Sequence, residues 1–254
     1  MSEILMQLVM MSNQLGNPQN DYVILGEGNS SARADEATFW VKASGTSLNG
    51  IDESGFVQVR LEPVLSLIDA PALSDTAVTD ALQSATINAS SQVRPSVETT
   101  FHAVALTTAE AQFVGHTHPT AVNSILCSQK AEEAFSGRLF PDEIVVCGPA
   151  PVFVPYTDPG IPLAKVIRDK IMVYQDGYGR SPKLILMQNH GMIALGQTAD
   201  EVLRITAMAV KAARILLGAY TIGAPRFLTP ADVARIDTRP DEHFRQRILA
   251  QRKI

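Results

Sequence analysis

Cysteine is scarce in this chain, and its two copies form no familiar motif. Cys127 and Cys147 lie 20 positions apart, so the sequence has no CxxC pair and no set of cysteines for a disulfide framework. This usage fits a reducing compartment. We interpret each cysteine as a small buried apolar residue.

Long hydrophobic runs and basic clusters are also missing. The apolar residues 1–11 carry Glu3 and no basic stretch, unlike a signal peptide, and they are too short to cross a bilayer. We expect an amphipathic first helix there. The net charge is −5 without a basic stripe, which argues against nucleic acid as a partner. These absences favour a cytoplasmic protein with neither a membrane nor a nucleic-acid partner.

The overall composition is that of an ordinary globular protein, with 46% hydrophobic and 19% charged residues. A chain of 254 residues can form one large domain or two small ones. It contains no internal repeat and no low-complexity linker. We therefore predict one domain over residues 1–254.

Alternation and β-branching predict short strands, and apolar periodicity predicts helices. Strands are expected at residues 22–25, 38–42, 56–60, 112–117, 144–146, 152–154, 184–187 and 192–195. Helices are expected from the N-terminus to about residue 15, within 61–90, from 95 to 106, at 119–127, 163–174 and 198–220, and in the tail 231–254.

Small polar residues gather in two loops, at residues 26–33 and 43–47. Their backbone N–H groups and hydroxyls are able to cradle an anion, and a hairpin between them would bring the loops together. Phosphate is the anion that we consider first. The open alternative is a pair of plain turns, which is the commoner use of such sequences.

A His-x-His pair follows the apolar residues 111–114. On a strand, His116 and His118 share one face with Cα atoms about 6–7 Å apart, and two imidazoles at that spacing suit one divalent ion. Pro119 ends the strand because it has no N–H. A polar pair that binds nothing remains the alternative.

Three histidines at strand ends and one glutamate at a helix start resemble the donors of a catalytic zinc site. His190 follows the predicted strand 184–187, and Glu98 lies just after Pro95. Three imidazoles leave a fourth position for water or substrate, and a nearby carboxylate can move protons. The alternative for Glu98 is an acid in the first helical turn, favoured there by the helix dipole.

Five short motifs in one order resemble the class II aldolase/adducin proteins. They are Gly28-Asn29-Ser30-Ser31-Ala32-Arg33, Ser44-Gly45, Pro95-Ser96-Val97-Glu98, His116-Thr117-His118-Pro119 and Asn189-His190-Gly191. The resemblance covers roughly residues 20–220. It is nearest to the fuculose- and rhamnulose-1-phosphate aldolases.

The resemblance implies a single α/β/α domain with a central, mainly antiparallel sheet, assembled as a homotetramer. It implies a divalent metal ion, Zn²⁺ first, with Mn²⁺, Co²⁺ or Fe²⁺ as alternatives. The residues it assigns are His116, His118 and His190 for the metal, Glu98 as acid/base, Tyr156 as an acid from a neighbouring subunit, and Gly28, Asn29, Ser44, Gly45 and Ser96 for phosphate.

The activity implied is that of a lyase in carbohydrate metabolism, which cleaves a ketose 1-phosphate by a retro-aldol reaction through a metal-stabilised enediolate. Decarboxylation of a 3-oxo acid or its phosphate, epimerisation and dehydration are alternatives within the same fold. A non-catalytic adducin-like interaction module would not need the histidines. Val97 departs from the pattern, because some members have a second serine there. The substrate's anionic group therefore stays open between phosphate and carboxylate.

Overall fold

A mainly antiparallel sheet of seven strands lies at the centre of the structure. The computed structural model describes residues 2–71, 73–88, 93–241 and 248. The strands are β1 (Asn29–Arg33), β2 (Thr38–Lys42), β3 (Phe56–Arg60), β4 (Phe113–Thr117), β5 (Val152–Val154), β6 (Leu184–Met187) and β7 (Gly191–Gly196). They follow the order β3-β2-β1-β4-β7-β6-β5, and in this described part β5 and β6 form the one parallel pair. The expected α/β class is confirmed.

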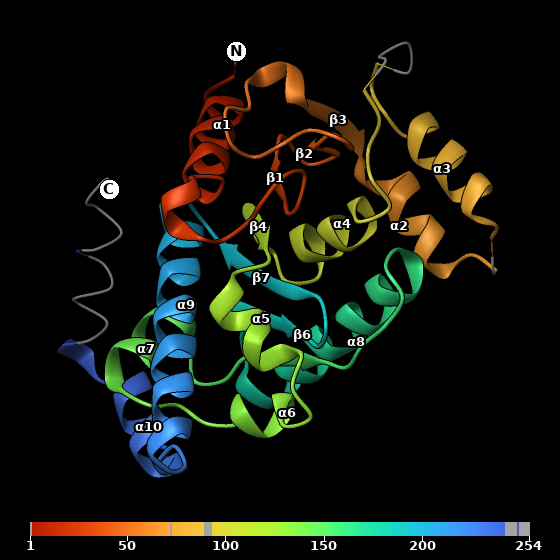
Figure 1. Cartoon of the computed structure of the whole chain (residues 1–254). Helices are drawn as coiled ribbons and strands as arrows, with labels where there is room; N and C mark the ends of the chain where they lie inside the picture. The colour runs from red at the N-terminus through yellow and green to blue at the C-terminus, as the bar shows by residue number, and fades with distance from the viewer. Residues whose placement is uncertain (1, 72, 89–92, 242–247, 249–254) are drawn as a thin grey trace.

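Helices cover both faces of the sheet (Figure 1). One face carries α2 (Leu61–Asp69), α4 (Thr99–Thr107) and α8 (Ile161–Tyr178), and the other carries α1 (Glu3–Leu15), α5 (Thr120–Leu126) and α9 (Ala199–Ile222). Side chains along a strand point alternately to the two faces. On β2, Phe39 and Val41 therefore join the core under α4, whereas Trp40 packs against the core under α1 and α9.

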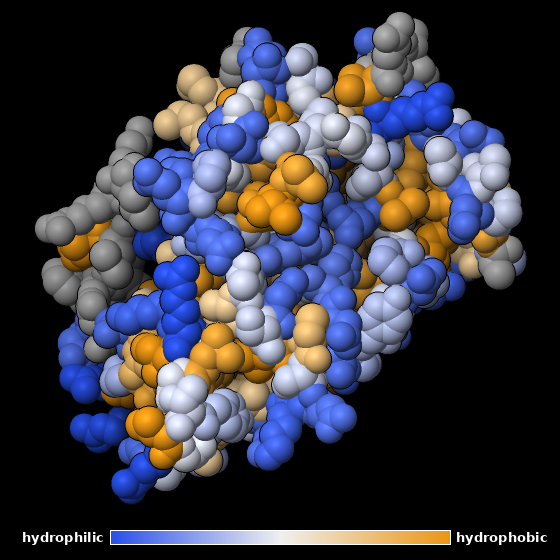
Figure 2. Space-filling model, viewed as in Figure 1, coloured by the Kyte–Doolittle hydropathy of each residue, from blue (hydrophilic) through white to orange (hydrophobic). Residues whose placement is uncertain are grey.

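Shorter elements pack on the outside of these layers. They are α3 (Asp75–Ser84), α6 (Ala131–Ala134), α7 (Pro141–Cys147), α10 (Pro230–Asp237), and the 3₁₀ helices η1 (Pro18–Asn20) and η2 (Glu53–Gly55). The expected tail helix over 231–254 is thus described as α10, and residues 242–247 and 249–254 lie outside the described residues. On the face shown in Figure 2, hydrophilic surface separates several apolar patches. No described helix is long and apolar enough to cross a membrane.

The helix boundaries follow local capping signals. Ser2 accepts the Leu5 N–H at the start of α1, and Thr198 accepts the Glu201 N–H at the start of α9, which satisfies donors that have no partner within the helix. The Glu201 carboxylate accepts the N–H of Gln197 rather than that of Thr198, so the capping box at Thr198 is only half formed. The predicted ends of α1 and α9 are confirmed within about two residues.

The strand predicted at 22–25 is wrong, and the real strand begins at Asn29 inside the stretch interpreted as a turn. Residues 24–27 form the turn, and Leu25 has a φ of 53°. The polar strand is stable because Ser30 bonds the Ser12 hydroxyl and Ser31 bonds a ring nitrogen of His102. Those partners come from distant segments, so the alternation of apolar residues does not reveal this strand.

The strand predicted at 144–146 is also wrong, because these residues lie in helix α7. Pro141 occupies the first turn, where its missing N–H costs nothing. Gly148 ends the helix at a φ of 82°, and its carbonyl accepts the guanidinium of the buried Arg138. Tertiary contacts and end signals here override the strand preference of a β-branched run.

The two cysteines differ in their surroundings, and both are free thiols. Cys147 is buried as expected, and burial raises the pKa of its thiol to about 12. Cys127 is exposed, so the expectation of a second buried cysteine is wrong. Cys127 is the residue just after the C-terminal end of α5, where the chain reaches the surface.

Candidate metal centre

The three predicted histidines come together at the ends of neighbouring strands. His116 lies in β4 and pairs with Asn29 of β1 on one side and Ile193 of β7 on the other. His118 follows the end of β4, and its backbone N–H donates to Tyr22 O over 2.9 Å. His190 lies in the turn from β6 to β7, so the sheet's central strands hold all three.

The β6–β7 turn is shaped to hold His190 close to the other two rings. Asn189 adopts a φ of 55°, a conformation that asparagine tolerates better than most residues, and Asn123 donates to His190 O over 2.9 Å. A Cβ at Gly191 would lie 2.6 Å from the ring of His118. Glycine is therefore required at this position for the strands to bring the rings together.

The spacing of the imidazole nitrogens fits one tetrahedral ion. One ring nitrogen from each histidine lies within 4.8 Å of the others, and the Nε2 atoms of His116 and His118 are 2.9 Å apart. Two nitrogens bound at 2.0–2.1 Å to a tetrahedral zinc are roughly 3.4 Å apart. The donor set therefore fits a divalent ion after small side-chain adjustments.

The protonation of His116 and His118 also suits metal binding. His116 Nδ1 lies 2.9 Å from Met192 O and donates to it, which leaves Nε2 with its lone pair facing the cluster. Burial lowers the pKa of His116 well below its usual range, and burial with the nearby His190 lowers that of His118. Neutral imidazole is the form that binds metal ions.

Glu98 points its carboxylate into the same cluster. Its Oε1 lies 3.1 Å from His190 Nε2 and 3.7 Å from His116 Nε2, and its Oε2 accepts a hydrogen bond from Asn29 Nδ2. Burial alone would raise the pKa of Glu98, but His116 and His190 outweigh it and lower that pKa to about 2. Glu98 is therefore ionised at neutral pH.

The position of Glu98 in its helix differs from the prediction. Helix α4 begins at Thr99, Glu98 is the residue before it, and the Glu98 side chain makes no capping hydrogen bond. The helix starts later than Pro95 because that segment pairs with the 43–47 loop, through a bridge between Ala43 and Pro95. The carboxylate faces the histidines rather than the helix end, so the interpretation as a simple helix-start acid is wrong.

The two small-residue loops each contact a segment that carries a site residue. Gly28 has a φ of 72°, and a Cβ there would lie 2.7 Å from His116 O, so the 26–28 turn packs directly on β4. In the second loop, the Ser44 N–H donates to Arg94 O over 2.7 Å. Ser44 and Gly45 are exposed. The buried Ser96 Oγ has no hydrogen-bond partner among the described residues.

Tyr156 is not brought to the histidines within this chain. Its side chain is 62% exposed, in the loop between β5 and α8, and none of the contacts described for residues 93–241 joins it to Glu98 or the histidines. The same loop reaches Val97, because a Cβ at Gly160 would lie 3.6 Å from Val97 Cβ. A role for Tyr156 at this site would have to come from a neighbouring copy.

Sequence reasoning missed two charged residues near the cluster. Lys42 is 2% exposed, its Nζ donates to Gly26 O over 3.4 Å, and burial lowers its pKa although Glu98 opposes the shift. Glu27 lies beside His118. His102, four residues after Glu98, is fully buried and bonds Ser31. The sequence offers one sign that Lys42 and Glu27 belong to the site: each lies in or beside a loop predicted to bind an anion.

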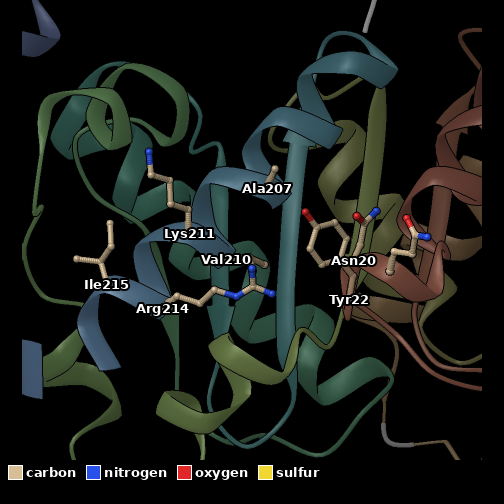
Figure 3. A pocket seen from close by; sticks show the side chains of 8 residues that line it. Asn20, Tyr22, Ala207, Val210, Lys211, Arg214 and Ile215 are labelled. Carbon is tan, nitrogen blue, oxygen red and sulfur yellow. The ribbon is translucent and has the colours of Figure 1, made fainter. Parts of the chain in front are cut away.

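Another pocket, of about 360 Å³, lies between η1 and α9 (Figure 3). Its lining contains none of the predicted site residues; it consists of Gln19, Asn20, Tyr22, Ala207, Val210, Lys211, Arg214 and Ile215. A hollow of about 400 Å³ does contain His118 and Glu27. The histidine cluster is therefore the better candidate for chemistry.

Comparison with known proteins identifies the family of this chain. Residues 7–217 match the family described as Class II Aldolase and Adducin N-terminal domain. A Bacillus subtilis protein named as an uncharacterized oxidoreductase, YuxG, is 31% identical over 208 residues, or 76% of this chain. The chain spans only 27% of that relative's length.

Solved structures of similar fold include an N-terminal class II aldolase domain of a conserved protein from Thermoplasma acidophilum. It is 26% identical with a TM-score of 0.66, and the match covers 85% of this chain and 94% of that one. An L-fuculose 1-phosphate aldolase is 18% identical with a TM-score of 0.68, over 96% of this chain and 97% of that one, and supports the fold alone. Because the family match spans most of its length, the chain belongs to the class II aldolase and adducin N-terminal domain family.

Proposed function

We propose that this protein is a metal-dependent lyase that cleaves a small sugar phosphate, a ketose 1-phosphate, by a retro-aldol reaction. The observation that carries the proposal is the convergence of three imidazoles with an ionised carboxylate. Two of the rings present Nε2 atoms 2.9 Å apart, an arrangement that calls for a cation or a proton between them. Membership of the class II aldolase family supports the same conclusion.

In this proposal His116, His118 and His190 hold the ion, with Zn²⁺ first and Mn²⁺, Co²⁺ or Fe²⁺ as alternatives. When bound, such an ion supplies Lewis acidity toward a carbonyl oxygen and stabilises negative charge beside it. Glu98 is the group that transfers the substrate's proton. Ionised at neutral pH, it can take a proton from the substrate and return it to the carbon left at the broken bond. Asn29 holds one carboxylate oxygen and leaves the other toward the histidines.

The anionic end of the substrate is proposed to lie between the two small-residue loops. The residues assigned to it are Gly28, Asn29, Ser44, Gly45 and Ser96. Ser96 supports this assignment, because its buried hydroxyl lacks a partner among the described residues and such a group is costly to leave unpaired. The buried ammonium of Lys42, tied to the Gly26 carbonyl, adds positive charge behind the first loop and so favours an anion.

A decarboxylase of a 3-oxo acid is the second candidate, and one residue favours it. Val97 stands next to Ser96 with its apolar side chain 38% exposed. It offers no hydroxyl to a phosphate, and a carboxylate has fewer oxygens to satisfy. Epimerase and dehydratase activities would use the same metal and acid/base groups. An interaction module without chemistry gives no reason to bury His116 with its Nε2 lone pair facing the cluster, as metal binding requires.

We further propose a homotetramer in which Tyr156 acts on the site of a neighbouring subunit. The exposure of Tyr156 and its loop's contact with Val97 support this arrangement, since the loop reaches the residue beside Glu98 while the phenol stays open to a neighbouring copy. The proposed Tyr156 acid would serve the aldehyde oxygen. Light scattering gives the subunit count, and Tyr156→Phe should lower turnover without changing metal content.

The test of the function combines metal analysis with a substrate screen. The purified full chain is assayed for bound divalent ions, then offered ketose 1-phosphates, their unphosphorylated analogues and 3-oxo acids with and without phosphate. Metal-dependent release of a three-carbon ketone phosphate supports the aldolase. Metal-dependent release of carbon dioxide supports the second candidate. A chain that binds no divalent ion at all contradicts both.

A further inference from the structure

Glu27 lies on the side of His118 that faces away from the other rings. The His118 Nε2 atom is 2.9 Å from His116 Nε2, whereas its Nδ1 atom is 3.9 Å from Glu27 Oε1. One ring nitrogen therefore faces the cluster and the other faces a carboxylate. Both side chains are partly exposed, at 20% for His118 and 38% for Glu27.

The Glu27 carboxylate is held in place by its own turn. The Glu27 N–H donates to Ile24 O over 3.0 Å, and the Ile24 N–H donates to Glu27 Oε2 over 3.1 Å. Oε2 is thus occupied, and Oε1 is left to face His118. The same segment also holds the histidine's backbone, since Tyr22 O accepts the His118 N–H. Ring and carboxylate are positioned together.

A metal ion needs the lone pair of Nε2, so the ring proton has to reside on Nδ1. Ligand histidines generally give that proton to a carboxylate or a backbone carbonyl, which fixes the tautomer and the ring's orientation. For His116 the acceptor is Met192 O. For His118 the group that faces Nδ1 is Glu27.

We propose that Glu27 is a positioning residue, which accepts the Nδ1 proton of His118 and thereby makes Nε2 the metal ligand. The 3.9 Å separation is longer than a hydrogen bond, and a small rotation of the exposed carboxylate closes it. This inference rests on the proposed metal site. Its rival is a Glu27 that contacts only the substrate, since it lines the same 400 Å³ hollow as His118.

The test measures zinc affinity of the full chain without any substrate, by competition with a chelator. Glu27→Gln keeps the size and the acceptor for the Ile24 N–H, but it can turn an amide N–H toward Nδ1 and favour the wrong tautomer. We expect zinc to bind about 10- to 100-fold more weakly, the usual cost of losing such a partner. Glu27→Asp keeps the charge but places it farther from the ring, so its zinc affinity should fall between those of wild type and Glu27→Gln.

Asp21→Asn is the matched control. Asp21 lines the same hollow and carries the same charge, but its carboxylate bonds Thr120 instead of a ring. Its φ of 57° is one that asparagine adopts readily. Zinc affinity should change by no more than about 2-fold in this control. Equal melting temperatures of the metal-free variants show that any loss of affinity is not unfolding.

Nitrogen NMR of the zinc-loaded chain measures the protonation of His118 directly. A Glu27 that only stabilised the fold would not change that signal. The His118 Nδ1 should carry a proton shifted downfield in wild type by its charged acceptor, and Glu27→Gln should lose that shift. Unchanged zinc affinity in Glu27→Gln overturns the proposal. So does an equal loss in Asp21→Asn, which would indicate a general charge effect. A wild-type chain that binds neither zinc nor any other divalent ion refutes the proposed function itself, and this inference with it.

Discussion

Acid should destabilise the metal-free protein through the buried His102. The ring is fully buried, its Nδ1 bonds Ser31 Oγ over 2.7 Å, and its Nε2 has no hydrogen-bond partner among the described residues. A second ring proton would therefore be buried without an acceptor. Burial lowers the pKa of His102 from 6.5 to about 4, although Glu98 opposes the shift.

The sign and size of the effect follow from linkage. A pKa lowered by folding contributes stability above the unfolded pKa, and this contribution is lost as pH falls. At pH 7 the ring is neutral in both states. At pH 5 most unfolded chains have protonated it and few folded ones have, which removes about 2 kcal/mol of unfolding free energy at 1.36 kcal/mol per pKa unit.

Urea unfolding of the metal-free full chain at pH 7 and pH 5 measures this loss. Other groups also lose stability in acid, so the comparison is with His102→Gln, whose loss between the two pH values should be smaller by about 2 kcal/mol. Ser31→Ala is the control, because it weakens the fold at both pH values but leaves the buried ring. Equal pH dependence in wild type and His102→Gln would refute the reasoning.

Three further changes test the site. The double variant His116→Ala/His118→Ala should lose the bound divalent ion measured by elemental analysis, and full metal content would place the site elsewhere. Glu98→Gln should keep most of the metal but lose turnover by roughly 10² or more, whereas near-normal turnover would remove Glu98 from the chemistry. Val97→Ser should tighten binding of a ketose 1-phosphate by roughly 1.5–3 kcal/mol, measured as KM beside the unphosphorylated analogue. No gain with phosphate would favour the carboxylate of a 3-oxo acid.

Local sequence was sufficient for many elements of the fold. The strand carrying His116, the helix after Pro119, the long helix capped by Thr198 and the loop 43–47 are all found where their patterns predict them. Each depends on alternation, periodicity or end signals within a few residues. The single domain over 1–254 and the cytoplasmic location stay predictions.

The sequence predicted only part of how the residues of the candidate site come together. The His-x-His pair indicates a metal by spacing alone, but Glu98 and His190 lie 18 and 74 residues from His116. The order of strands β1, β4 and β7 is what brings these residues together. The family resemblance supplied the grouping, and the sheet register explains it.

What the sequence determined by itself was the set of chemical groups, namely three histidines, one glutamate and two loops of small donors. Tertiary structure alone decided that the polar residues 29–33 form a strand, that residues 144–146 are helical, and that Glu27 faces His118. The reason is that these outcomes depend on partners far away in the chain. Ser31 becomes a buried strand residue only because His102 is there to bond it.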